Sequence, residues 1–478
     1  MAHDYTCKCK IKMWIAGVIG AFTILAFQSD ANAQSTPRWS SDSLSELSHG
    51  ILGAASCATS SCHGGPRAGV SSEFSARGSE YPLWLEKDPH AASWRTMNSE
   101  KSLAILSKLG IWRDTKIAKP EAYQNCLACH NSDKNVGADT LTPRITEGIG
   151  CESCHGASER WFDQHYQGES SRRFAVENLG LTDMKSLVQR AKACTLCHVG
   201  GQDRDMNHDI IAAGHPALYF DMAAYHESYP KHWRDPQQND PNFRSRLWLA
   251  GQIAMADSEL ELLAARADKK LPISTWPEFA NYQCTSCHVS LDSIPRSPTQ
   301  DTIVTGRAPI REWNLRGVEN LSNYLNLQES DLLEASKTLK SRMEAANPNA
   351  EAVAANSNEL QRMLRILSNR DESLLLWSRE RQSQLSAQRL LNDRKNSNWE
   401  YAAGTYLSAW ATLSNKRNVV LDGNMNTIRN ALLFPIGSQT PQFPRNSKTA
   451  PPNAPPNLEQ WKTALENASV IILENGQK

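Results

Sequence analysis

The sequence has no excess of charge of either sign. It carries 51 lysines and arginines against 51 aspartates and glutamates in 478 residues, so nothing predicts a nucleic-acid-binding surface or a polybasic membrane arm. Apolar residues are also scarce, at 40% of the chain, and the mean hydropathy is −0.52. This composition leaves little aliphatic core for a chain of this length. We expect something other than side chains to fill part of the interior.

Long apolar runs are absent after the N-terminus. The run Met13–Phe27 follows three lysines between residues 8 and 12 and precedes the small residues of Ala31-Asn-Ala33. This order is typical of a secretory signal peptide, and the run is shorter than the about 20 residues that a spanning helix needs. We expect residues 1–33 to be cleaved on export to the periplasm or beyond, with an uncleaved anchor as the alternative. The mature chain should have no transmembrane segment.

The cysteines are arranged in pairs. Two of the twelve, Cys7 and Cys9, belong to the expected signal peptide, and the other ten form five pairs, each followed directly by a histidine. The five sets are Cys57, Cys62 and His63; Cys126, Cys129 and His130; Cys151, Cys154 and His155; Cys194, Cys197 and His198; and Cys284, Cys287 and His288. An even cysteine count in an exported protein usually indicates disulfides. A disulfide framework, however, gives no reason for a histidine after every pair.

Four of these sets have the form Cys-x-x-Cys-His, which is the attachment signature of haem c. The two thiols add to the two vinyl groups of haem, and the adjacent imidazole binds the iron as proximal ligand. The first set has four residues between its cysteines, so its backbone has to loop out. We interpret it as haem attachment too, with a Cys57–Cys62 disulfide or a zinc site as alternatives. The sequence therefore predicts five covalent haem c groups.

Histidines outside the motifs are candidates for the second axial ligand. Seven remain in the expected mature chain, which is enough for two histidines at every iron but does not exclude an open iron. We select four as distal ligands: His90, His165, His208 and His215. The other three, His49, His226 and His232, are weaker candidates for the fifth distal position.

Local sequence supports this selection at two places. Asp88 can cap and Pro89 can open a helix whose first turn carries His90. Gly214 should end the helix that begins near His208, so that His215 points in a new direction.

Several of these features occur together in one stretch of the chain. Asp88-Pro-His90-Ala-Ala follows an early attachment site, and Gly148-Ile-Gly-Cys151-Glu-Ser-Cys154-His155-Gly156 precedes His165. In these motifs, the segment from about Cys57 to Cys197 resembles the tetrahaem cytochrome c-554/c-prime family. The resemblance implies haems in close pairs, bis-histidine ligation at most irons, and transfer of electrons from a periplasmic dehydrogenase. The widened first motif, the fifth haem and a long C-terminal extension depart from that family.

The same features are similar to a wider superfamily that includes pentahaem nitrite reductases and octahaem hydroxylamine oxidoreductases. In the nitrite reductases one haem is typically held by Cys-x-x-Cys-Lys, and no such motif occurs here. We therefore predict a periplasmic pentahaem cytochrome that transfers electrons between redox partner proteins. The alternative function is oxidoreduction of small nitrogen compounds at a five-coordinate haem, and a third is a scaffold stapled by haem.

No convincing strand alternation occurs, so we predict a mainly α fold. Short helices and irregular loops should surround stacked haems in residues 46–320, with one longer helix at Arg244–Ala267. No cysteine or histidine follows residue 325, and apolar positions such as those of Leu360–Leu367 recur there with helical spacing. We expect a helical region at 321–434, a Pro-rich linker at 435–456 and a terminal helix at 457–478. This extension is either a packing cover or a module for homo-oligomer formation.

Overall fold

The computed structural model describes most of the chain between residues 50 and 412. The described residues are 50–65, 78–114, 116–132, 147–235, 237–271, 275–284, 287, 307–324, 331–368, 379–392, 399–412 and six positions between 423 and 470. The expected signal peptide, the Pro-rich linker and nearly all of the expected terminal helix lie outside them, as do His49 and His288. Of two compact units, Met1–Trp39 and Ser40–Lys478, the described residues all belong to the second.

Short helices carry the cysteine motifs or lie near them in the sequence. In chain order they are η2 Ala54–Cys57, α2 Glu80–Lys87, η3 Pro89–Ala92, α3 Ser93–Met97, α4 Glu100–Lys108, α5 Pro120–His130, α7 Glu152–His155, α8 Glu169–Phe174, η4 Ala175–Leu179, α9 Leu187–His198, α10 His208–Ala213, α11 Met222–Ser228 and η5 Phe279–Asn281. Two short strands, β1 Trp112–Arg113 and β2 Lys116–Ile117, pair antiparallel. The predicted mainly α fold is confirmed.

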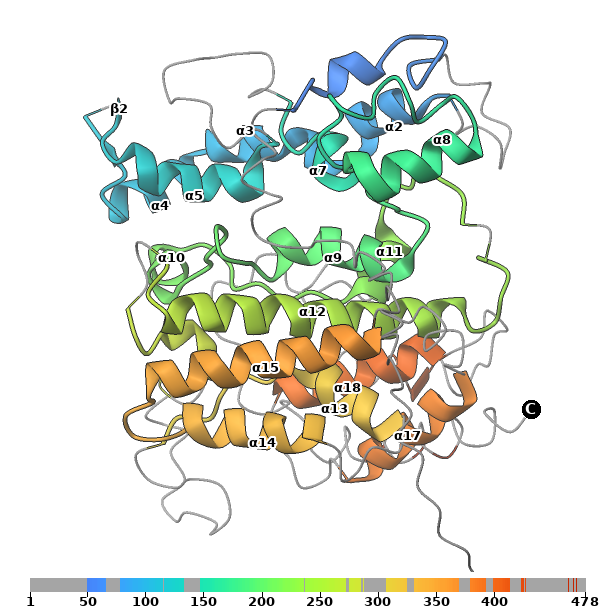
Figure 1. Ribbon diagram of the computed structural model, residues 1–478. Helices are drawn as coiled ribbons and strands as arrows, with labels where there is room; N and C mark the ends of the chain where they lie inside the picture. The colour runs from blue at the N-terminus through green and yellow to red at the C-terminus, as the bar shows by residue number, and fades with distance from the viewer. Residues whose placement is uncertain are drawn as a thin grey trace, which may run out of the picture. The chain divides into compact units, whose positions relative to one another are not determined.

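A long helix, α12 Phe243–Ala267, lies between the motif-bearing helices and the C-terminal ones (Figure 1). It packs against α9 on one side and against α15 and α13 on the other. Its position confirms the helix predicted at Arg244–Ala267. The C-terminal helices are α13 Arg316–Tyr324, α14 Asp331–Met343, α15 Ala350–Ser368, α17 Arg379–Asn392 and α18 Trp399–Thr412. Among the described residues, no helix combines the length and the apolar character needed to cross a bilayer.

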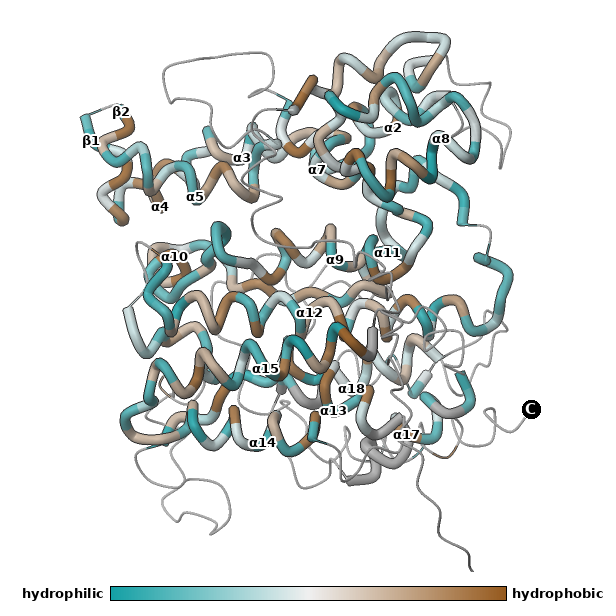
Figure 2. The backbone as a smooth tube through the Cα atoms, in the orientation of Figure 1, coloured by the Kyte–Doolittle hydropathy of each residue, from teal (hydrophilic) through white to brown (hydrophobic). Residues whose placement is uncertain are grey.

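The apolar core is concentrated around α12. Leu247, Ile253, Leu260 and Leu364 are almost fully buried in one large cluster, which α11, α12, α13, α15 and α18 all join. Figure 2 shows hydrophobic positions recurring along α12 and α15. In the described residues before α9, the apolar clusters are small, such as the one around Ala54 and Trp84. Aliphatic packing therefore supports the C-terminal half far more than the half with most of the motifs.

Close helix contacts in this core depend on a glycine. A Cβ added at Gly251 of α12 would lie 2.3 Å from the Cβ of Met222 at the start of α11. The absence of a side chain at Gly251 therefore lets α11 and α12 approach.

We predict that Gly251→Ala lowers the free energy of unfolding by about 1–3 kcal/mol, because overpacking against α11 outweighs the gain in helix propensity. Urea unfolding of the haem-loaded protein, followed by circular dichroism at 222 nm, measures it. Gly201→Ala is the control, since its Cβ would meet only the Glu261 carboxylate, at 3.6 Å. An equal stability of the two variants would contradict the packing argument.

Candidate haem sites

A large cavity lies among the motif-bearing helices. Its volume is about 2030 Å³, roughly twice the upper end of the range of about 300–1,000 Å³ for ordinary small-molecule pockets. Its walls include the cysteines and histidines of the first four motifs. Histidines outside the motifs line it as well: His90, His165, His215, His226 and His232. The size and the lining fit several flat cofactors in one continuous space.

The widened first motif reproduces a hydrogen bond of the ordinary ones. In the third motif the His155 N–H donates to the Cys151 carbonyl at 2.9 Å, and in the first the His63 N–H donates to the Cys57 carbonyl at 3.3 Å. The extra residues form an exposed turn, in which the Cys62 N–H donates to Thr59 at 2.9 Å. In both motifs the histidine backbone is thus hydrogen-bonded to the first cysteine, although the first motif is two residues longer.

Among the described residues, four pairs of histidine rings face one another. A metal–imidazole bond is about 2 Å long and a ring centre lies ~1.1 Å behind its nitrogen, so two imidazoles on opposite sides of one metal ion have centres about 6.2 Å apart. The observed separations are 6.2 Å for His63 and His165, 6.1 Å for His90 and His198, 6.4 Å for His130 and His215, and 6.4 Å for His155 and His232. Each pair joins one motif histidine to one histidine outside the motifs. This separation fits an iron between the two rings.

Hydrogen bonds orient several of these rings through Nδ1. His63 donates to Glu80 at 3.2 Å, His90 to Asp88 at 2.9 Å, and His215 to the Pro216 carbonyl at 2.9 Å. His165 donates to the Phe162 carbonyl at 2.7 Å. A histidine that binds a metal usually donates its other ring N–H in this way. The bonds leave each Nε2 available to a metal.

Burial favours the neutral imidazole at two of the four pairs. It lowers the pKa of His130, His215 and His232, and lowers the pKa of His155 to about 4. Neutral imidazole is the form that binds a metal. His63 differs, because its hydrogen bond to Glu80 raises its pKa.

The residues between the cysteines also have structural roles. Glu152, in the third motif, is buried and accepts hydrogen bonds from the backbone N–H groups of Leu52, Gly53 and Ser158 at 2.7 to 3.0 Å. The carboxylate therefore ties the segment before the first motif to the third motif. Next to it, Gly156 has a φ of +85°, and a Cβ there would lie 2.2 Å from the Gly180 carbonyl.

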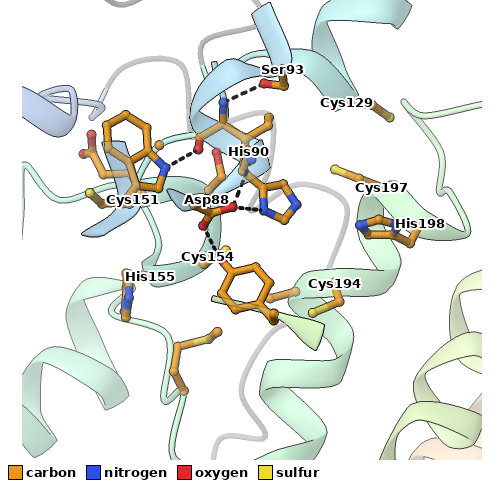
Figure 3. A pocket seen from close by; sticks show the side chains of 18 of the residues that line it. Asp88, His90, Ser93, Cys129, Cys151, Cys154, His155, Cys194, Cys197 and His198 are labelled. Carbon is orange, nitrogen blue, oxygen red and sulfur yellow. Dashed lines mark hydrogen bonds and ion pairs between the residues drawn. The ribbon is translucent and has the colours of Figure 1, made fainter. Parts of the chain in front are cut away.

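Cysteines from different motifs lie together. The Cys57 thiol lies beside that of Cys151, and the Cys129 thiol beside that of Cys197. Figure 3 shows Cys129 and Cys197 on neighbouring segments, with His90 and His198 beside them. The first attachment site therefore neighbours the third, and the second neighbours the fourth.

The fifth motif lies apart from the cavity. Cys284 and His208 are not among its described lining residues. The His208 N–H donates to Glu278 at 2.8 Å, and its ring lies 5.8 Å from that of Phe279. His208 thus lies close to the chain that leads into Cys284. Whether it faces His288 falls outside the described residues.

The structure separates two histidines that the sequence left equivalent. His232 faces His155, whereas Nε2 of His226 lies 3.1 Å from Arg190 Nη1 and 3.2 Å from Asp235 Oδ2. His226 belongs to this buried polar cluster. The sequence left His232 among the weaker candidates, because it does not show that the tertiary fold brings Arg190 to His226.

The geometry does not favour the two alternatives to haem attachment. No disulfide joins any two of the ten cysteines from Cys57 to Cys287. Among the described residues, no three Cys, His, Asp or Glu side chains cluster as a bare metal ion would need.

Comparison with known proteins gives one match. Residues 56–156 match the family model described as cytochrome c554 and c-prime. No curated protein matches the chain. No solved structure matches it either.

The matched segment contains the first three attachment motifs and His90. It begins one residue before Cys57 and ends at Gly156, directly after His155. Residues 56–156 are therefore a domain of the cytochrome c554 and c-prime family.

Proposed function

We propose that the chain is an exported pentahaem cytochrome that transfers electrons between redox partner proteins. The observation that carries this proposal is the set of four facing histidine pairs, each of a motif and a non-motif residue, at 6.1 to 6.4 Å. In this proposal the proximal ligands are His63, His130, His155, His198 and His288, and the distal ligands are His165, His215, His232, His90 and, at the fifth haem, His208. Haem attachment and most of the ligation lie in residues 46–320.

Haem c supplies an iron that cycles between the ferric and ferrous states. The paired histidines would hold the iron, and the chain orients four of their imidazoles through Glu80, Asp88 and backbone carbonyls. An iron with two protein ligands has no open position for a small substrate. This argument favours electron transfer over reduction of nitrite or oxidation of hydroxylamine.

The attachment sites differ in exposure. Cys62 of the first motif and Cys287 of the fifth are exposed, whereas the described cysteines of the three motifs between them are not. The His63 side chain is 43% exposed. We therefore propose that donor and acceptor proteins dock at the first and fifth sites. Contacts between Cys57 and Cys151 and between Cys129 and Cys197 favour transfer within two pairs of sites.

We predict that the mature protein carries five covalent haems, so that its intact mass exceeds that of the processed chain by five haem masses. The Cys57→Ser, Cys62→Ser double variant should lose one haem, because both thiols of the widened motif are then missing. Mass spectrometry of the denatured protein measures both. Four haems in the unmodified protein, with Cys57 and Cys62 joined as a disulfide, would refute the attachment at this motif.

We also predict that His232→Ala converts one of the five haems to high spin with all attachments intact, because the His155 iron loses its distal ligand. Electron paramagnetic resonance of the oxidised protein detects the change. His226→Ala is the matched control. It should leave all haems low-spin and lower the free energy of unfolding by about 1–3 kcal/mol, since Arg190 and Asp235 lose a buried partner. If a high-spin haem appeared in His226→Ala and not in His232→Ala, His226 would be the distal ligand in place of His232.

A further inference from the structure

A buried polar cluster joins the C-terminal helices to the fifth attachment site. Tyr219 donates to Glu400 Oε1 at 3.0 Å, and Arg311 Nε donates to the same oxygen at 3.1 Å. The Arg311 guanidinium also lies 4.3 Å from the centre of the Tyr219 ring. Tyr219 and Glu400 are 7% and 6% exposed. The cluster is therefore an ion pair and a phenol shielded from water.

Backbone pairing brings the cluster to Cys284. The Arg311 N–H donates to the Asn281 carbonyl at 2.7 Å, and the Gln283 N–H donates to the Pro309 carbonyl at 3.0 Å. The Tyr219 side chain also lies near the Cys284 thiol. The two charges thus lie beside the first cysteine of the fifth motif.

The next residue connects this cluster to the fourth site. Phe220 follows Tyr219 in the chain and stacks on His198, with ring centres 5.0 Å apart and planes at 26°. The backbone at Phe220 is fixed by Trp313, whose Nε1 donates to its carbonyl at 3.1 Å. Tyr219 and Phe220 therefore reach from the fifth attachment site to a ligand of the fourth.

Glu400 comes from a part of the chain without cysteine or histidine. It lies in the first turn of α18 (Figure 1), at the end of the helix that carries the positive pole of its dipole. Buried ion pairs contribute little net stability on average, so stability is a weak reason for this cluster. A charge in a poorly polarisable interior acts strongly on another charge nearby, and reduction changes the charge of a haem by one.

We propose that Glu400 is a positioning residue that sets the midpoint potential of the fifth haem, together with Arg311 and Tyr219. Its carboxylate holds Arg311 and Tyr219 against Cys284 and stabilises the oxidised form of that haem. The C-terminal region is then part of the redox unit. This inference rests on the proposed function, because it requires a haem at Cys284.

The test is a potentiometric titration of the haem-loaded variants. Glu400→Gln keeps the size of the side chain and removes its charge, so one of the five midpoint potentials should rise. The expected change is about tenfold in the equilibrium constant for reduction, or about 59 mV for one electron. Arg311→Gln should lower the same potential, and the double variant should return towards the unmodified value. Shifts of opposite sign in Glu400→Gln and Arg311→Gln indicate an effect of charge, because a disturbance of packing gives no reason for the sign to reverse.

Two control variants separate the effect of the Glu400 charge from other effects: one removes a different carboxylate, and the other removes a hydrogen bond to Glu400. Glu312→Gln removes a neighbouring carboxylate whose partner is the half-exposed Lys340, and should leave all five potentials unchanged. Tyr219→Phe removes a hydrogen bond to Glu400 without a change of charge. It should change the equilibrium constant for reduction of the fifth haem less than threefold.

Three outcomes overturn the inference. If the protein carries five haems and Glu400→Gln shifts no midpoint potential more than Glu312→Gln does, the role of Glu400 is refuted while the proposed function stands. If Tyr219→Phe shifts the midpoint potential by the same amount and in the same direction as Glu400→Gln, the role of the Glu400 charge is refuted. Four haems in the unmodified protein, with Cys284 and Cys287 free, refute the proposed stoichiometry and this inference with it. If Glu400→Gln does not fold, the sign of the Arg311→Gln shift decides.

Discussion

The distance between two imidazoles on opposite sides of one metal ion constrains the motif-bearing part of the chain. Each facing pair joins residues at least 77 positions apart, and the rings of each come within 6.4 Å. Proposed iron ligation at these pairs would close long loops where the apolar clusters are small. Binding of this kind contributes directly to the free energy of folding, because the unfolded chain has no preformed site.

Features fixed by neighbouring residues were predictable from the sequence. Asp88 caps the short helix that Pro89 opens, and its side chain accepts the His90 N–H as expected. Gly214, with a φ of +120°, ends α10 before His215. The family resemblance was also carried by contiguous residues, from Gly148 to Gly156, and the matching family model confirms it.

Features that depend on distant partners were not predictable. His226 and His232 lie six residues apart and both line the cavity, but Arg190 from α9 and Asp235 hold the His226 ring in a polar cluster. Nothing in the sequence around Glu400 indicates a redox role, since Tyr219 is 181 residues away. The sequence predicted the helix α12, and periodicity predicted a helix at the position of α15, but neither predicted the polar side chains that connect the C-terminal helices to the attachment sites.

The low apolar content has different consequences in the two parts of the chain. Its aliphatic residues are gathered around α12, while the cavity occupies the space among the short helices. The helix α9 belongs to both, because it packs against α12 and ends at His198 of the fourth motif. The apolar core therefore supports the fourth site, whereas the first three sites lie on helices held mostly by small clusters and hydrogen bonds. The free energy of folding of these three should depend more strongly on haem attachment than that of the fourth.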